Sequence, residues 1–571
     1  MNTTLTIRFP VCLVLISASL GFQKKPRPAE TILTNGKFIT VDEKKPQAEA
    51  LAIRADRIVA VGSKEEIARF HGPNTKVIDI RGKTVIPGFI EGHGHFMSLG
   101  QSKMSLDLTK VRNWNEIVQM VRAAVQVSKP GEWIVGRGWH QEKWNRPPEK
   151  NVDGYPSHES LSRVSPNNPV LLTHASGHAC FANKKAMELA NINPKTKPPE
   201  GGEILKDSNA NPIGVFRETA QAVLRREYGK AQALRTPQQR KKDRLRAFQL
   251  ATEECLSNGV TSFQDAGSTF ETIDQFKQWA KDGKMKLRMW VMVRDSNERL
   301  KTRLKNYRMI GFGNNLLTVR AIKRSADGAL GSHGALLLKP YRDLPQSSGL
   351  RTSSIVSIQE TALLAVQNDF QLCVHAIGDR ANRDVLDIFQ TIFRSFPHKK
   401  SLRWRVEHAQ HLNPADIPRF GEMGVIASMQ GIHCTSDAPY VLERLGKKRA
   451  QAGAYVWQKL MKSGALIANG TDVPVEEVDP IPNYYATVTR RLKDGSTFFP
   501  NQRMSRMEAL KSYTIIAAYA AFEEKIKGSL SVGKLADLVV LSQNLLTVAD
   551  DKILDTNVEM TLIGGKIVYR R

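Results

Sequence analysis

The sequence predicts an α/β protein built around a (β/α)8 TIM barrel, with a small composite β-sandwich made from both termini and an inserted lid subdomain. Eight short apolar runs bounded by turn residues predict strands, and helix-like stretches lie between most of them over roughly 400 residues. The runs lie within residues 84–96, 260–264, 287–293, 317–323, 371–376, 404–408, 425–430 and 466–471. We expect the barrel to occupy residues 85–523, with its active site at the carboxyl ends of the strands.

The first run breaks at Pro87-Gly88 and ends in His93 and His95. Side chains two residues apart on a strand point to the same face, so the two imidazoles can grip one metal ion. Taken alone, the pair does not distinguish a metal site from a chance spacing in a His-containing protein. Whether the pair indicates a metal site depends on the residues that end the later runs.

Two of the intervening stretches illustrate the predicted helices. Residues 272–282 and 359–369 have helical patterning. Ser357 precedes the second stretch and Glu360 follows three residues later, which predicts a capping box at its start.

Polar side chains with metal-binding chemistry end five of the eight runs. They are His93 and His95 on the first, Lys323 on the fourth, His375 on the fifth, His408 on the sixth and Asp472 just past the eighth. Each also has an ordinary explanation: a hydrogen-bonded core histidine, a lysine paired with Asp327, or a turn cap after Gly470. Their joint occurrence in strand order favours one shared site at the barrel mouth.

Both ends of the chain contain strand patterns that are too small to fold alone. Residues 31–41 and 48–61 precede a helix capped by Ser63 and Glu66, and residues 535–541 and 560–569 follow the barrel. Neither end has enough apolar residues to bury its own core. We therefore expect residues 29–84 and 524–571 to form one composite β-sandwich, approached through a helix capped by Ser505 and Glu508.

Residues 1–23 have the pattern of a signal peptide. Arg8 precedes an apolar run over 9–22 that ends in small residues, and the run is short for a transmembrane span. The sequence therefore predicts an exported, periplasmic or extracellular protein with no stable membrane span after cleavage. An uncleaved N-terminal anchor is the alternative.

The composition narrows the class of partner. The chain has 83 basic and 56 acidic residues and a net charge of +27, scattered without a basic groove of interleaved aromatics, which argues against nucleic acid. A positive field of this kind favours anionic substrates, although only weakly. The four cysteines outside the leader have no zinc-finger or disulfide-framework spacing.

Seven local motifs from about residue 30 onward resemble those of the amidohydrolase superfamily, and within it the branch that includes N-substituted formamide deformylases. They are residues 85–95, 259–267, 323–331, 374–381, 405–410, 470–474 and 528–537. The resemblance implies a metal-dependent enzyme of this fold and says little about the substrate.

Carried over to this sequence, the resemblance implies that His93, His95 and Asp472 hold one divalent metal ion and that His375 and His408 hold a second. Lys323 would be carboxylated and bridge the two. Zinc suits this set of imidazoles and carboxylates best, with manganese, cobalt or iron as alternatives, and whether one or two ions bind stays open.

A long insertion between the first two barrel strands, about residues 131–218, predicts a lid subdomain. Substrate-orienting candidates in and around it are His178, Glu218, Asp327 and Gln430, although buried polar residues often only satisfy backbone groups. Trp139, Trp144 and Phe181 are equally compatible with a pocket wall and with ordinary packing.

The expected activity is hydrolysis of a C–N bond in a small amide, formamide or cyclic amide through a metal-activated hydroxide, with Asp472 as the catalytic proton carrier. An isomerase or decarboxylase on the same barrel is the first alternative. A non-catalytic scaffold is the second, and it predicts missing ligands, whereas all six candidates are present. A homo-oligomer is left open.

Overall fold

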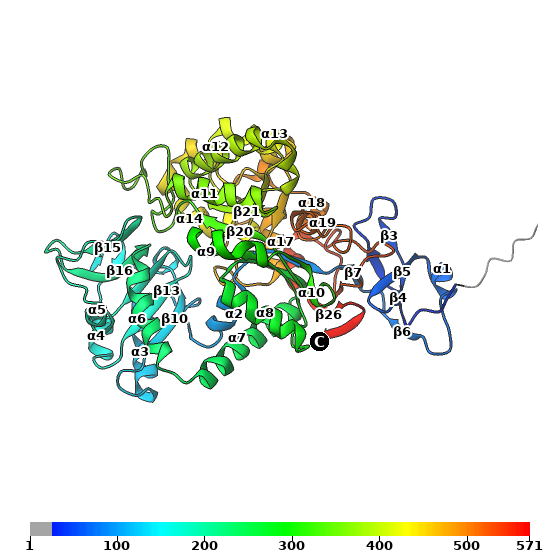
Figure 1. Cartoon of the computed structure of the whole chain (residues 1–571), viewed down its shortest axis with the longest axis horizontal. Helices are drawn as coiled ribbons and strands as arrows, with labels where there is room; N and C mark the ends of the chain where they lie inside the picture. The colour runs from blue at the N-terminus through cyan, green and yellow to red at the C-terminus, as the bar shows by residue number, and fades with distance from the viewer. Residues whose placement is uncertain (1–25) are drawn as a thin grey trace, which may run out of the picture.

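The computed structural model describes residues 26–571 and centres on eight parallel strands arranged as a barrel (Figure 1). Each strand pairs with the next along the chain, and the short β19 (Met309–Gly311) adds to β20 from outside this path. The strands are β8 (Phe89–Gly94), β17 (Val260–Ser268), β18 (Arg288–Val293), β20 (Leu317–Ser325), β21 (Gln371–Ala376), β22 (Arg405–His408), β23 (Ile426–Met429) and β24 (Ile467–Asn469). All eight predicted runs contribute a barrel strand, so the predicted fold class is confirmed.

The first and last barrel strands approach each other closely. A Cβ atom placed on Gly92 of β8 would lie 2.3 Å from the carbonyl oxygen of Asn469 on β24. Only glycine fits at this distance, so Gly92 lets the two ends of the sheet meet.

The first predicted run divides at the Pro87-Gly88 break. β7 (Thr84–Pro87) pairs with β2 (Lys37–Ile39) and with β25 (Leu538–Leu541), while β8 belongs to the barrel. A Cβ atom on Gly88 would lie 2.1 Å from the Thr261 side chain, so the turn between the two sheets requires glycine. The barrel therefore begins at Phe89, four residues later than residue 85.

Strands from both ends of the chain form two further sheets (Figure 1). One has the order β5-β4-β1-β6 and the other β27-β26-β25-β7-β2-β3. Their remaining strands are β1 (Thr31–Thr34), β3 (Gln47–Ala48), β4 (Ala50–Arg54), β5 (Arg57–Gly62), β6 (Lys76–Asp79), β26 (Val558–Ile563) and β27 (Lys566–Arg570). Leu33, Ile53, Val85, Leu538 and Leu562 share one buried core, so the two termini stabilise each other.

A buried ion pair joins these terminal sheets to the barrel. Arg288 on β18 donates from Nε to Asp537 Oδ2 at 2.6 Å and from Nη2 to Oδ1 at 2.9 Å. Only 5% and 3% of the two side chains are exposed. This two-point geometry fixes the orientation of the two parts at that contact.

The insertion forms its own sheet, on the opposite side of the barrel from the terminal sheets (Figure 1). Its order is β15-β16-β14-β13-β10-β9. The elements are β9 (Leu106–Asp107), α3 (Trp114–Val127), β10 (Ile134–Trp139), β13 (Val170–His174), β14 (Ala179–Ala182), β15 (Gly202–Lys206) and β16 (Pro212–Glu218). The inserted structure thus begins before residue 131, and Trp139 and Phe181 are fully buried in its core, where they pack instead of walling a pocket.

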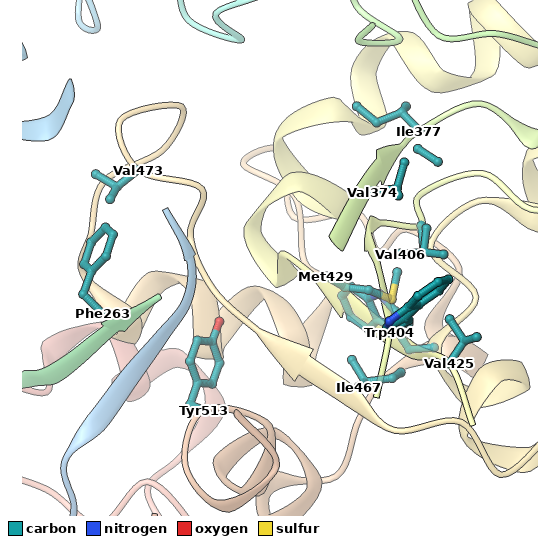
Figure 2. Close-up of a cluster of buried hydrophobic side chains, with 14 of the residues drawn as sticks. Phe263, Val374, Ile377, Trp404, Val406, Val425, Met429, Ile467, Val473 and Tyr513 are labelled. Atoms are coloured by element: carbon teal, nitrogen blue, oxygen red, sulfur yellow. The ribbon is translucent and has the colours of Figure 1, made fainter. Parts of the chain in front are cut away.

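Helices follow most of the barrel strands. They include α2 (Phe96–Ser102), α7 (Pro237–Ser257), α8 (Phe270–Lys281), α9 (Asn297–Arg303), α11 (Ile355–Gln367), α12 (Asp379–Ser395), α13 (Ile417–Met423), α14 (Gly431–Leu445), α17 (Pro480–Thr489) and α18 (Arg506–Ser512). Apolar side chains between the strands and these helices form the main core. Figure 2 shows part of it, with Trp404, Val406, Met429 and Ile467 gathered around neighbouring strands.

Two predicted capping boxes are present and one is wrong. Ser63 with Glu66 and Ser505 with Glu508 cap α1 (Lys64–Ala68) and α18 as expected. The helix α11, however, begins at Ile355 with Ser354 as its N-cap, so Ser357 lies inside it. Ser354 supplies an equivalent side chain one turn earlier, and Glu360 instead accepts a hydrogen bond from Asn297.

The predicted leader, residues 1–23, lies outside the described residues. Within residues 26–571, no helix has both the length and the apolar character needed to cross a bilayer. The cysteines of this part of the chain, Cys180, Cys255, Cys373 and Cys434, are all buried and unpaired with one another.

Candidate metal centre

Three side chains from the first and last barrel strands converge at the carboxyl end of the barrel. Nε2 of His95 lies 3.2 Å from Oδ1 of Asp472, and Nε2 of His93 lies 3.6 Å from the same oxygen. One donor atom from each of the three residues lies within 4.8 Å of the others. This spacing can hold a metal ion.

The other three predicted residues border the same space. The His408 ring lies 4.7 Å from the His93 ring and 4.5 Å from the His375 ring, measured between centroids. Nζ of Lys323 lies 3.4 Å from Nε2 of His93. The structure therefore brings all six predicted side chains together.

A further histidine, His433 in the first turn of α14, joins this cluster. Donor atoms of His408, His433 and Asp472 lie within 4.8 Å of one another. Sequence reasoning missed His433 because it lies on a helix beyond the seventh strand and not on the strand itself. The signal was its position three residues after Gln430, where the chain leaves that strand.

Glu407 contacts the ring nitrogen of His93 that points away from Asp472. The sequence patterns did not identify this residue. Its carboxylate accepts a hydrogen bond from Nδ1 of His93 and pairs with Nε of Arg405 at 2.7 Å. Burial alone would raise the pKa of Glu407, but the positive Arg405 and the His93 contact bring it below its ordinary value. Glu407 is therefore ionised at neutral pH.

The charge state of the cluster follows from its burial. Burial, with a smaller contribution from Lys323, lowers the pKa of His93 to about 4. Burial also lowers the pKa of Lys323 to about 8, since a charged amine is poorly solvated there. A neutral His93 that donates from Nδ1 directs the lone pair of Nε2 into the site.

Strained backbone accompanies several of these residues. His408, Asp472 and Glu218 have φ angles of 74°, 59° and 49°, which L side chains rarely adopt. Such conformations persist where surrounding contacts impose them, and they concentrate at functional sites. Glu91 supplies one such contact, because its carboxylate accepts from N and Oγ1 of Thr471, directly before Asp472.

The donor set fits a divalent metal ion. Nε2 of His433 and Nε2 of His375 are buried and make no hydrogen bond within the described part of the chain, although Oδ1 of Asp327 lies 3.4 Å from Nε2 of His375. Buried polar atoms without partners cost free energy, and imidazole nitrogens beside a carboxylate are favoured ligands of zinc and related ions. A metal ion would satisfy these atoms.

The four substrate-orienting candidates fall into two groups. Three of them, His178, Glu218 and Asp327, border the cavity, and the first two bond to each other, with Nδ1 to Oε2 at 2.7 Å. Asp327 accepts from the backbone N–H groups of Leu336, Ile377 and Gly378 at 2.8, 3.0 and 2.8 Å. Gln430 bonds through Oε1 to Nδ1 of His408 at 2.8 Å, so it orients that ring.

A cavity of about 980 Å³ opens onto the cluster. Barrel residues His95, Lys323 and Asp472 line it together with His178 and Glu218 from the insertion. Pockets of several hundred Å³ suit small molecules. The insertion thus builds one wall of a small-molecule site.

Fold and site together define a (β/α)8-barrel protein with a metal-binding centre at the carboxyl ends of its strands. The chain belongs to the amidohydrolase family, whose family model matches residues 76–569. This family is metal-dependent, which agrees with the cluster of imidazoles and carboxylate.

Similar proteins span nearly the whole chain. Protein LONG AFTER FAR-RED 3 of Arabidopsis thaliana is 32% identical, covering 95% of this chain and 92% of its own length. N-substituted formamide deformylase of Arthrobacter pascens is 25% identical, covering 95% and 98%. An uncharacterised metal-dependent hydrolase of Pyrococcus horikoshii has a similar structure, with a TM-score of 0.72, 25% identity and coverage of 91% and 99%.

Proposed function

We propose that the protein is a metal-dependent hydrolase of a C–N bond in a small amide, formamide or cyclic amide. The observation that carries the proposal is the meeting of His93, His95, Lys323, His375, His408 and Asp472 at one end of the barrel, facing a cavity of small-molecule size. The similarity to a protein named as a formamide deformylase supports the choice of bond.

In this proposal His93, His95 and Asp472 would hold one divalent ion, most simply zinc. His375 and His408 would hold a second, a carboxylated Lys323 would contribute ligand oxygens, and His433 is near enough to His408 and Asp472 to contribute. A bound ion of this kind polarises a carbonyl group and lowers the pKa of water from about 15.7 toward about 7.

Asp472 is the proposed proton carrier. Burial would raise its pKa, but His95, His93 and His408 hold the pKa of this carboxyl well below its ordinary range, so it is ionised and can accept a proton. It takes the proton of the attacking water and delivers it to the leaving nitrogen. General acid-base help of this kind contributes about 10² to 10⁴ in rate.

His178 is placed to bind the substrate carbonyl. Its ring centroid lies 5.0 Å from that of His375, and it lines the cavity. Burial opposes its charge, but Glu218 raises the pKa of His178 above its ordinary value. We propose that it donates a hydrogen bond to the carbonyl oxygen, which gains negative charge as water adds.

The test begins with the metal content of the purified protein by elemental analysis. The metal-loaded protein is then offered a panel of N-formyl and N-acyl amines, with the released amine measured. Asp472→Asn should remove nearly all turnover and leave the fold intact. Retention of more than about a tenth of the activity would exclude the proton-carrier role, since that role accounts for at least about a hundredfold.

Asp479→Asn is the matched control. Asp479 lies seven residues further along and caps α17 through Ile481 N, at 2.9 Å. Asparagine caps helices about as well as aspartate, so this variant should fold and retain activity. A protein that carries metal but releases amine from no member of the panel would contradict the proposed reaction.

A further inference from the structure

Four arginines line the cavity that faces the metal centre. Arg137 and Arg225 come from the insertion side, on β10 and α6 (Gln221–Ala233), and Arg294 and Arg324 come from the ends of β18 and β20. The cavity therefore has positive side chains on both the insertion and the barrel.

None of these guanidinium groups has a carboxylate oxygen within 4.0 Å among residues 26–571. Arg324 is engaged by Thr361 and Asn297, and Arg137 donates to the Ala175 carbonyl at 2.9 Å. The other two have fewer contacts. Arg225 donates to Gln221 at 3.0 Å and Arg294 to Ser325 at 3.4 Å, which leaves most of their N–H groups free.

The positive charges of Arg225 and Arg294 also interact with each other. Both side chains line the same cavity and are exposed there, so each guanidinium is charged at neutral pH. Two like charges beside one cavity repel unless an anion lies between them. This arrangement favours a negatively charged ligand.

Most acidic side chains of the cavity already pair with a basic side chain. Asp295 pairs with Arg299 at 3.2 Å, Glu360 pairs with Lys301, and Glu218 bonds to His178 at 2.7 Å. Asp327 and Asp472 also line the cavity and face the histidines of the proposed metal centre, whereas Glu298, in the first turn of α9, has no ion pair among the described residues. With Asp327 and Asp472 directed to the metal centre, Glu298 alone cannot neutralise four arginines.

We propose that the substrate carries an anionic group and that Arg225 and Arg294 bind it while the scissile amide faces the metal centre. This inference rests on the proposed amide hydrolysis and names its substrate class: small amides with a carboxylate or a group of similar charge. Charge-assisted contacts to arginine are among the stronger hydrogen bonds in proteins.

The test compares succinamate with succinamide, which differ in one end group: succinamate has a carboxylate where succinamide has a second neutral amide. Binding to the metal-loaded full chain is measured by calorimetry, so turnover is not needed. Succinamate should bind at least about tenfold more tightly than succinamide, as expected for a charged hydrogen bond. Arg225→Gln and Arg294→Gln should each reduce the preference for succinamate about tenfold. Arg225→Lys should retain more of that preference than Arg225→Gln, because lysine keeps the positive charge.

Arg226→Gln is the matched control. Arg226 lies next to Arg225 on α6, is exposed, and has Glu227 3.6 Å away. It does not line the cavity, so its replacement should leave the preference for succinamate intact. Thermal unfolding of each variant checks that the fold is retained.

Three results would overturn the inference: equal binding of the two compounds, no detectable binding of succinamate, or the same loss in Arg226→Gln as in Arg225→Gln. The last would mean that only the overall positive field acts. If the protein discriminates between the compounds but hydrolyses no amide, the anion site stands and the proposed reaction fails. If the protein hydrolyses neutral amides but binds succinamate and succinamide equally, the proposed reaction stands and the anion site fails.

Discussion

The Glu407 carboxylate on β22 accepts a hydrogen bond from Nδ1 of His93 on β8, across the interior of the barrel. A carboxylate can only accept, so the proton of the imidazole lies on Nδ1. Nε2 is left with its lone pair toward Asp472 and Lys323. Glu407 thereby fixes the tautomer of a proposed metal ligand.

Glu407→Gln should therefore weaken metal binding by about 10- to 100-fold, the usual effect of losing a carboxylate behind a histidine ligand. The measurement is competition for zinc with a chelator of known affinity. Glu422→Gln, an exposed position on α13, serves as the control. Equal metal retention in both variants would show that Glu407 has no such role.

Lys323→Met should lower the amount of bound metal. Lys323 is buried among the histidines, and in the proposed centre its carboxylated form contributes ligand oxygens that methionine lacks. Elemental analysis of wild-type and variant protein, prepared with bicarbonate, gives the two stoichiometries. An unchanged metal content would rule out Lys323 as a ligand.

Breaking the buried Arg288–Asp537 pair should destabilise the protein strongly. Arg288→Met leaves the buried Asp537 carboxylate without its partner, which typically costs about 3–5 kcal/mol. Thermal unfolding of the wild-type and variant proteins measures the shift in Tm. Lys552→Met breaks the exposed pair with Asp555 and should cost less than about 1 kcal/mol, because water screens that pair. Similar shifts for the two variants would contradict this difference.

The start of α11 allows a comparison of two serines. Ser354→Ala removes the side chain that accepts from Ser357 N and should cost about 1 kcal/mol of unfolding free energy. Ser357→Ala, inside the helix, should cost less. Urea denaturation of both variants measures the order, and a larger loss for Ser357 would place the cap where the sequence pattern alone predicted it.

The barrel was predictable because its strands are parallel and buried on both faces. Such strands are nearly continuous apolar runs, and the carboxyl ends of these runs identified His93, Lys323, His375 and His408 in order. Asp472 followed from the same logic, just past the last run.

Other parts of the site depend on contacts that sequence spacing does not encode. His433 enters from a helix, and Glu407 acts through a ring more than 300 residues away in the chain. The insertion begins earlier than predicted: β9 has only two residues, too few to give a pattern, and the helix pattern of α3 does not show which sheet the helix covers. The arginines of the cavity come from four separate elements, so no local motif joined them.

The position of β7 has a consequence for how the protein is made. β7 pairs with β2 on one edge and with β25 on the other. β25 leaves the ribosome on the order of 450 residues after β7, a delay of tens of seconds at usual rates of translation. During that interval the nascent chain presents an unpaired strand edge, which can pair with another chain until β25 is available to cover it.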